Sequence, residues 1–170
     1  MTAHNITANL LKELFSYNKE TGTVTRTIAR GNNIKAGSEA GTKNSQGYLI
    51  VNVNGKNVRL HHIAWCLTHG YIPNKIDHIN QNKQDNRIVN LREVTTTENN
   101  RNMPKPRHNT SGTVGVYYNK ANSNWRAFIH LNNKTKSLGS FKTKEEAIKA
   151  RLEANIKYGF HENHGKERVV

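Results

Sequence analysis

The chain has 170 residues, of which 34% are hydrophobic, and a net charge of +14 at pH 7. This length allows one domain or two small ones, and the sequence has neither an apolar run of about 18 residues to cross a membrane nor a secretory signal at its start. The single cysteine, Cys66, excludes an internal disulfide and a zinc site built from several cysteines. We therefore expect a cytoplasmic protein that is not membrane-bound.

The positive charge is the strongest signal in the composition. Between Asn99 and Lys144 the sequence has nine Lys or Arg and no Asp or Glu. Such a basic segment favours a polyanionic partner. Nucleic acid fits better than a membrane surface, because no amphipathic helix rich in Lys and bulky apolar residues is present.

The first elements follow from apolar spacing and turn residues. A short helix is predicted around Leu10 to Phe15, with Asn5 or Thr7 as its N-cap. A short strand around Val24 and a Gly- and Asn-rich loop follow. The segment "YLIVNVNGKNVRL" predicts a hairpin at its Asn-Gly pair, and "HHIAWCLTHG" predicts a helix that ends at Gly70.

The segment "IDHINQNKQDNRIVNLREVTTTENNRN" places a carboxylate, an imidazole and several amides close together. Asp77 is a hard oxygen ligand for a cation such as Mg²⁺, and a neutral His78 can take a proton from water. Thr95 and Glu98 form a capping box, which predicts a helix that carries Asn99 as a second oxygen ligand. A buried Asn90 amide can bridge backbone groups and orient His78.

This segment resembles the HNH (ββα-metal) endonuclease motif, in the form found in phage and homing enzymes. The resemblance covers roughly residues 10–102 and includes "GYLIVNVNGKNVRLHHIAW" and "AGSEAG". It implies that His78 is the general base, that Asn90 is the middle position, and that Asp77 and Asn99 bind Mg²⁺ or Mn²⁺. Asn99 stands where many relatives have His. No structural zinc is expected, because the cysteine pairs of zinc-bound relatives are absent.

A second unit follows a basic linker. The runs "TVGVYYN", "NWRAFIHL" and "KTKSLGSF" predict three strands, and a capping box at Thr143 to Glu146 opens a helix that ends at Gly159. We therefore expect an α+β protein with four parts, which are an HNH domain at residues 1–103 (core motif 58–102), a linker at 104–112, a sheet-and-helix domain at 113–160 and a loose tail at 161–170.

The unit from Ser111 to Gly159 resembles the ethylene-response-factor (Apetala-type) DNA-binding domain, on the signs "GVYYN", "NWRAFI" and "KSLGSF". The resemblance implies a three-stranded sheet laid in the major groove of DNA. Strand alternation places Trp125 and Ala127 on the face opposite Arg126 and Phe128, and we expect Phe128 in the core. Trp125 either contacts DNA or packs on the helix, and His61 either lines the site or packs against Trp65. The DNA-binding candidates are His61, Arg101, Lys105, Arg107, Tyr118, Trp125, Arg126, Lys134 and Lys136.

Three functions stay open from the sequence. The leading one is a metal-dependent endonuclease that acts on double-stranded DNA as a monomer or homodimer and leaves 5′-phosphate and 3′-hydroxyl ends. The second is a DNA-binding regulator without activity on a nuclease-like fold, although binding alone needs none of Asp77, His78 and Asn99. The third is an RNA-binding or RNA-cleaving protein, which the scarcity of exposed-looking aromatic residues on the sheet disfavours.

Overall fold

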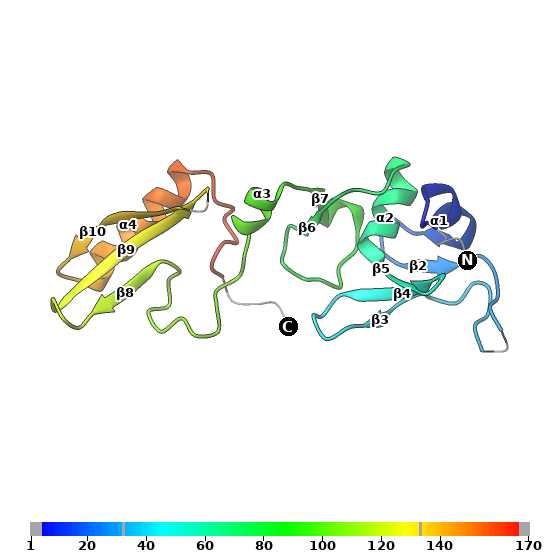
Figure 1. Cartoon of the computed structure of the whole chain (residues 1–170), viewed down its shortest axis with the longest axis horizontal. Helices are drawn as coiled ribbons and strands as arrows, with labels where there is room; N and C mark the ends of the chain where they lie inside the picture. Colours follow the sequence, from blue (N-terminus) through cyan, green and yellow to red (C-terminus); the bar gives the residue numbers. More distant parts are fainter. Residues whose placement is uncertain (1–4, 32, 133, 167–170) are drawn as a thin grey trace. The chain divides into compact units, whose positions relative to one another are not determined.

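The computed structural model describes residues 5–31, 33–132 and 134–166, and its architecture is α+β (Figure 1). The chain forms two compact units, residues 1–94 and residues 95–170. The boundary lies at Val94 and Thr95, ahead of the predicted boundary at residue 103.

The first unit contains most of the predicted motif. Its elements, in chain order, are α1 (Ala8–Leu14), β1 (Phe15–Tyr17), β2 (Val24–Arg26), β3 (Thr42–Lys43), β4 (Leu49–Val53), β5 (Lys56–Arg59), α2 (Leu60–His69), β6 (Ile76–His78), the 3₁₀ helix η1 (Ile88–Asn90) and β7 (Leu91–Glu93). The strands form three antiparallel groups, β1 with β2, β3 with β4 and β5, and β6 with β7.

Local signals account for these elements. The Thr7 hydroxyl accepts a hydrogen bond from the Leu10 N–H at 3.2 Å and caps α1. Asn54 and Gly55 both have positive φ, 49° and 81°, as a two-residue hairpin turn requires between β4 and β5. Gly70 ends α2 in the left-handed region with φ of 87°. The predicted hairpin, the N-cap at Thr7 and the helix end at Gly70 are confirmed.

Two apolar clusters hold the first unit together. Leu11, Val24, Val53 and Ile63 are buried in the larger cluster, which joins α1, α2 and the hairpin. Ala64, Ile76 and Leu91 form the smaller one, so β6 and β7 are anchored to α2 from one side. Burial of each Leu or Ile side chain stabilises the unit by about 1.5–3 kcal/mol. The position of β6 is therefore fixed by packing.

The second unit begins with the short helix α3 (Thr96–Asn100) and continues with a sheet and a long helix. Its strands β8 (Val116–Asn119), β9 (Asn124–Leu131) and β10 (Lys134–Phe141) pair antiparallel in the order β10-β9-β8, and α4 (Lys144–Lys157) packs on the sheet. Both predicted capping boxes are present, at Thr95 with Glu98 and at Thr143 with Glu146.

The two faces of β9 are reversed relative to our expectation. Ala127 and Ile129 are buried, and Ala127 packs with Val116 and with Ala147 of α4. The prediction that Phe128 is a core residue is therefore wrong, because α4 covers the odd-numbered positions of the strand. Alternation places Phe128 and Arg126 on the opposite face.

The segment after α4 differs from the loose tail expected from its composition. The His161 N–H donates to the Arg101 carbonyl at 3.1 Å, the Gly165 N–H donates to the Met103 carbonyl at 2.9 Å, and the Lys105 N–H donates to the Lys166 carbonyl at 2.9 Å. Residues 161–166 are thus paired with residues 101–105 inside the second unit. Residues 167–170 lie outside the described part of the chain.

The described residues contain no helix with the length and apolar character needed to cross a membrane.

Candidate active site and nucleic-acid interface

The pairing of β6 with β7 positions the predicted catalytic residues. His78 is opposite Leu91 in the register, and Asp77 is opposite Arg92. The Arg92 guanidinium donates two hydrogen bonds to Asp77 Oδ2, from Nε at 3.0 Å and from Nη2 at 2.7 Å. Because neighbours on a strand point to opposite faces, Asp77 points toward Arg92, while His78 points toward His61 of α2 and Tyr48.

His78 is a buried histidine with a defined orientation. His78 is only 4% exposed, and its Nε2 lies 3.2 Å from Asn86 Oδ1. An amide oxygen only accepts, so the ring must donate from Nε2. In the neutral ring the basic nitrogen is therefore Nδ1.

The loop between β6 and η1 is held by Asn90. This buried amide donates from Nδ2 to the Asp85 carbonyl at 2.8 Å, and its Oδ1 accepts from the Asn80 N–H at 2.9 Å. The Ile79 N–H also donates to the Asn90 carbonyl at 2.9 Å. Asn90 bridges backbone groups across the loop, as its predicted orienting role requires.

Asn86, at the end of the same loop, is the direct partner of His78. Sequence reasoning did not single it out, because it is one asparagine among many in the segment. It is buried, and its carbonyl accepts a hydrogen bond from the Tyr17 hydroxyl at 2.8 Å. The backbone at Asn86 and Arg87 also touches Gly22, where an added Cβ would lie 2.6 Å from the Arg87 nitrogen and 2.8 Å from the Asn86 carbonyl carbon. The β1–β2 turn is thus in close contact with the loop that orients His78.

A cluster of rings surrounds the other side of His78. The His61 ring lies edge-on to His78 with centroids 4.9 Å apart, and Tyr48 lies 5.3 Å from His61 and 6.0 Å from His78. Two cations flank the Tyr48 ring, the Arg59 guanidinium at 4.5 Å and the Lys83 ammonium at 4.6 Å from its centroid. The site thus combines a buried imidazole with two nearby positive charges, which suits a phosphate.

His61 is 1% exposed and its ring lies against the ring of His78, while its role in the site stays a prediction. Its Nε2 is buried and has no hydrogen-bond partner. Burial, together with the smaller effect of the neighbouring His78, lowers the pKa of His61 to about 2. Burial also lowers the pKa of His78, although its hydrogen bond to Asn86 acts in the opposite direction. The predicted contact of His61 with DNA stays a prediction.

Asn99 lies on α3 in the second unit, on the helix that the Thr95 capping box starts. Its pairing with Asp77 around one cation stays a prediction. The donor chemistry fits such an ion, because Mg²⁺ takes one or two carboxylate oxygens, amide oxygens and substrate phosphate. Among the described residues no three His, Cys, Asp or Glu side chains are grouped closely enough to hold a metal ion.

The predicted DNA-binding residues of the second unit fall on different faces of the sheet. Tyr118 is opposite Trp125 in the register, and both point to the α4 side, where Trp125 packs against the core. Lys136, paired with Ile129, is on the same side and donates to the Tyr158 hydroxyl at 2.8 Å. Lys134 pairs with Leu131 and shares that side. Their contacts with DNA stay predictions.

Arg126 lies on the face away from α4, together with residues that the sequence did not identify. Tyr117 is its cross-strand partner, and the Tyr117 and Phe128 rings are 5.9 Å apart. The His130 ring lies 5.1 Å from Phe128. We call Tyr117, Arg126, Phe128 and His130 the outer stripe. The alternation of side chains along the strands groups these residues on one face, but only the position of α4 shows that this face is the outer one.

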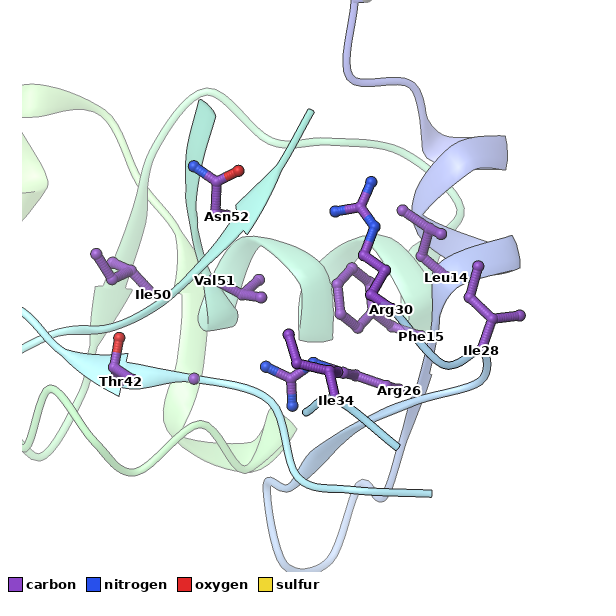
Figure 2. Close-up of a pocket in the computed structure, with 11 residues that line it drawn as sticks. Leu14, Phe15, Arg26, Ile28, Arg30, Ile34, Thr42, Ile50, Val51 and Asn52 are labelled. Carbon is purple, nitrogen blue, oxygen red and sulfur yellow. The ribbon is translucent and has the colours of Figure 1, made fainter. Parts of the chain in front are cut away.

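A separate hollow of about 350 Å³ lies on the first unit, and Figure 2 shows apolar and guanidinium side chains around it. Arg30 donates to Asn54 Oδ1 at 3.0 Å, and Arg26 donates to Ser38 Oγ at 3.4 Å. Both guanidinium groups are thus hydrogen-bonded within the unit, and they hold the loop between β2 and β3 in place.

Part of the chain is similar to known proteins. Residues 58–101 match the HNH endonuclease family. This span includes Asp77, His78, Asn90 and Asn99, as well as Arg59, His61 and Asn86. Over 76 residues the chain is 37% identical to protein 3.8 of Escherichia phage T7, an alignment that covers 44% of this chain and 63% of that protein. No solved structure matched the chain.

Proposed function

We propose that the chain is a metal-dependent endonuclease that hydrolyses phosphodiester bonds in double-stranded DNA and leaves 5′-phosphate and 3′-hydroxyl ends. The observation that carries the proposal is the setting of His78 within the segment that matches the HNH endonuclease family. This imidazole is buried, is held at Nε2 by Asn86, and adjoins Asp77 on β6.

In this proposal His78 is the general base. Because Nε2 donates to Asn86, the ring takes a proton at Nδ1 from the water that attacks phosphorus in line. The neutral His61 ring packs against His78 and restrains it from the side opposite the loop. Asn90 acts indirectly, because it holds the loop that carries Asn86.

Asp77 and Asn99 would hold the divalent cation, Mg²⁺ or Mn²⁺. Bound there, the cation supplies Lewis-acid stabilisation of the scissile phosphate and of the leaving 3′ oxygen. Arg59 and Lys83 add positive charge next to Tyr48 and attract the phosphate backbone toward His78.

The second unit binds the DNA on which the first unit acts. The net charge of +14 supports a phosphate backbone as the partner. The outer stripe places Arg126 and two aromatic rings on one exposed side of the sheet. With one site per chain, a monomer nicks one strand, and a homodimer would cut both. Similarity to a phage protein supports a place of action in the cytoplasm of an infected bacterium.

The second candidate is a DNA-binding protein that does not cleave. The Asp77–Arg92 ion pair favours it, because this pair gives the carboxylate a structural role in joining β6 to β7. Under this alternative the His78 and Asn86 pair serves only to fold the loop.

Conversion of supercoiled plasmid separates the two candidates. The full chain is incubated with plasmid in Mg²⁺ or in EDTA, next to His78→Ala and to His69→Ala as a matched control at an exposed histidine of the same unit. We expect nicked plasmid from the wild type and His69→Ala in Mg²⁺ alone, and a loss of at least about 100-fold in His78→Ala.

Folded wild-type protein that shifts duplex DNA on a gel, but leaves the plasmid intact in Mg²⁺ and Mn²⁺, would reject the nuclease and support the second candidate. Ligation of the nicked product without prior treatment identifies the predicted 5′-phosphate and 3′-hydroxyl ends.

A further inference from the structure

The second unit contains a cavity of about 450 Å³ that none of the roles above uses. It is lined by the 100–106 segment, by Val114 and Gly115 just before β8, by the second half of β9, by α4, and by residues that follow α4. The volume is within the range of about 300–1,000 Å³ that is usual for small-ligand sites. Its chemistry is unusual, because the walls are mostly apolar or aromatic while a buried cation lies among them.

The buried cation is Arg151 of α4, which is 2% exposed. Its Nε donates to the Val114 carbonyl at 2.8 Å, and its Nη2 lies 3.2 Å from His164 Nε2. Neither partner is an acid, and no salt bridge joins Arg151 to an acidic side chain in the part of the chain that the structure describes. A buried charge without a counter-charge costs several kcal/mol. The site therefore favours an anion.

Two nitrogen atoms on residues that line the cavity have no hydrogen-bond partner. One is Arg151 Nη1, which is buried and takes part in no hydrogen bond. The other is His164 Nδ1, which is also buried and unpartnered. Because a guanidinium can only donate, His164 Nε2 must accept, and a neutral His164 then carries its hydrogen on Nδ1. These two unsatisfied donors, one of which is on the Arg151 cation itself, match the oxygen atoms of a phosphate.

The remaining lining suits a flat apolar group next to that phosphate. Phe160 lies 5.1 Å from the Arg151 guanidinium carbon, and Arg101 lies 5.9 Å from the same ring. Further apolar wall comes from Met103, Pro104, Pro106, Val114 and Phe128. Phe128 and His130 belong to the outer stripe as well, so the cavity adjoins the side of the sheet that we propose for nucleic acid.

We propose that this cavity binds a nucleotide, with its phosphate on Arg151 and His164 and its base against the aromatic and proline wall. The occupant is a single nucleotide unit, either free or at the phosphorylated end of a strand. This site lies in the second unit and does not rest on the nuclease activity proposed for the first.

The test is calorimetric titration of the full chain with dTMP in EDTA, where its outcome is independent of cleavage. Thymidine and inorganic phosphate are titrated separately as probes of each half of the ligand. We expect dTMP to bind at least about 100-fold more tightly than thymidine, because charge-assisted hydrogen bonds to the phosphate are lost in the nucleoside. Inorganic phosphate should also bind more weakly than dTMP, because it leaves the apolar wall exposed.

Three variants assign the binding to this cavity. Arg151→Met removes the cation with little change in length and should abolish dTMP binding, whereas Lys149→Met removes one charge from an exposed position of the same helix and should change nothing. If Arg151→Met does not fold, Met103→Trp keeps Arg151 and fills the cavity from a wall position that is half exposed. It should weaken dTMP binding at least about tenfold.

Absence of dTMP binding by the folded wild type at millimolar concentration overturns the proposal, as does equal binding by Met103→Trp and the wild type. Equal affinity for inorganic phosphate and dTMP overturns the nucleotide assignment. A 5′-phosphorylated oligothymidylate that binds more tightly than dTMP supports the proposal with a strand end as the ligand. Weaker binding of that oligonucleotide supports it with the free nucleotide.

Discussion

Both units bury polar side chains, but they satisfy them in different ways. In the first unit His78, Asn86 and Asn90 are hydrogen-bonded to one another or to the loop backbone. In the second unit Arg151 is buried, two of its three guanidinium nitrogens are hydrogen-bonded, and no acid among the described residues pairs with it. In the first unit His61 Nε2 lacks a partner, but His78 itself is held by hydrogen bonds that fix its orientation. A buried cation that lacks a counter-charge and has an unpartnered nitrogen indicates a ligand from outside the unit.

The largest expected effect comes from a change at Asp77. It distinguishes a carboxylate that binds the metal ion from one that only forms the ion pair with Arg92. Asp77→Asn should lower the rate of plasmid nicking at least about 100-fold, because a cation site loses its carboxylate. Arg92→Gln removes only the ion pair and should cost less than about tenfold. Nicking rates measured over a range of Mg²⁺ concentrations compare the two variants. Equal losses in both would mean that Asp77 acts only through Arg92.

A smaller loss is expected when the partner of His78 is removed. Asn86→Ala deletes the acceptor at Nε2 and should slow cleavage about 10- to 100-fold, in the range found when groups behind a reactive residue are removed. Asn86→Asp keeps an acceptor oxygen and should recover part of the rate. Single-turnover nicking by the two folded variants measures this difference. An equal loss in Asn86→Asp and Asn86→Ala would argue against a positioning role.

The contact between the β1–β2 turn and the site loop is tested at glycine. Gly22→Ala places a methyl group 2.6 Å from the Arg87 nitrogen, so the loop that carries Asn86 must move. Gly37→Ala is a matched control, since its φ of 77° is close to the 78° of Gly22 while nothing lies within 4 Å of the added Cβ.

Both glycine variants should lose about 1–3 kcal/mol of unfolding free energy from the unfavourable φ. Only Gly22→Ala should also lose cleavage rate, and retained binding of duplex DNA would show that the second unit is intact. Urea unfolding and plasmid nicking give the two readings. Full cleavage activity in Gly22→Ala would mean that the turn does not support the site.

The smallest expected effect is the pH dependence of stability in the second unit. Burial lowers the pKa of His164 to about 4, and the neighbouring Arg151 acts in the same direction. Between pH 6.5 and pH 4 the unfolded chain therefore binds the extra proton, and stability should fall as the pH is lowered through this window. His164→Gln should reduce the slope of unfolding free energy against pH, and His108→Gln, at an exposed position, should not. Parallel slopes in the wild type and His164→Gln would contradict the pKa shift.

Much of the local structure was predictable because it depends on a few neighbouring residues. The Asn54–Gly55 hairpin, the two capping boxes and the helix end at Gly70 all follow from short-range geometry. Residue type and spacing also make Asp77, His78 and Asn90 candidates for the site. Asn86 was not, because nothing in its neighbourhood distinguishes it from Asn80 or Asn82.

By itself, the sequence determined the α+β class, the basic character, and the segment that matches the HNH endonuclease family. Only the tertiary structure decided which face of β9 is covered, since alternation gives two equal faces until α4 packs on one of them. It also decided that His61 packs against His78 and that Arg151 is buried with no acid paired to it in the described part of the chain. These contacts join residues far apart in the chain, and no local pattern records them.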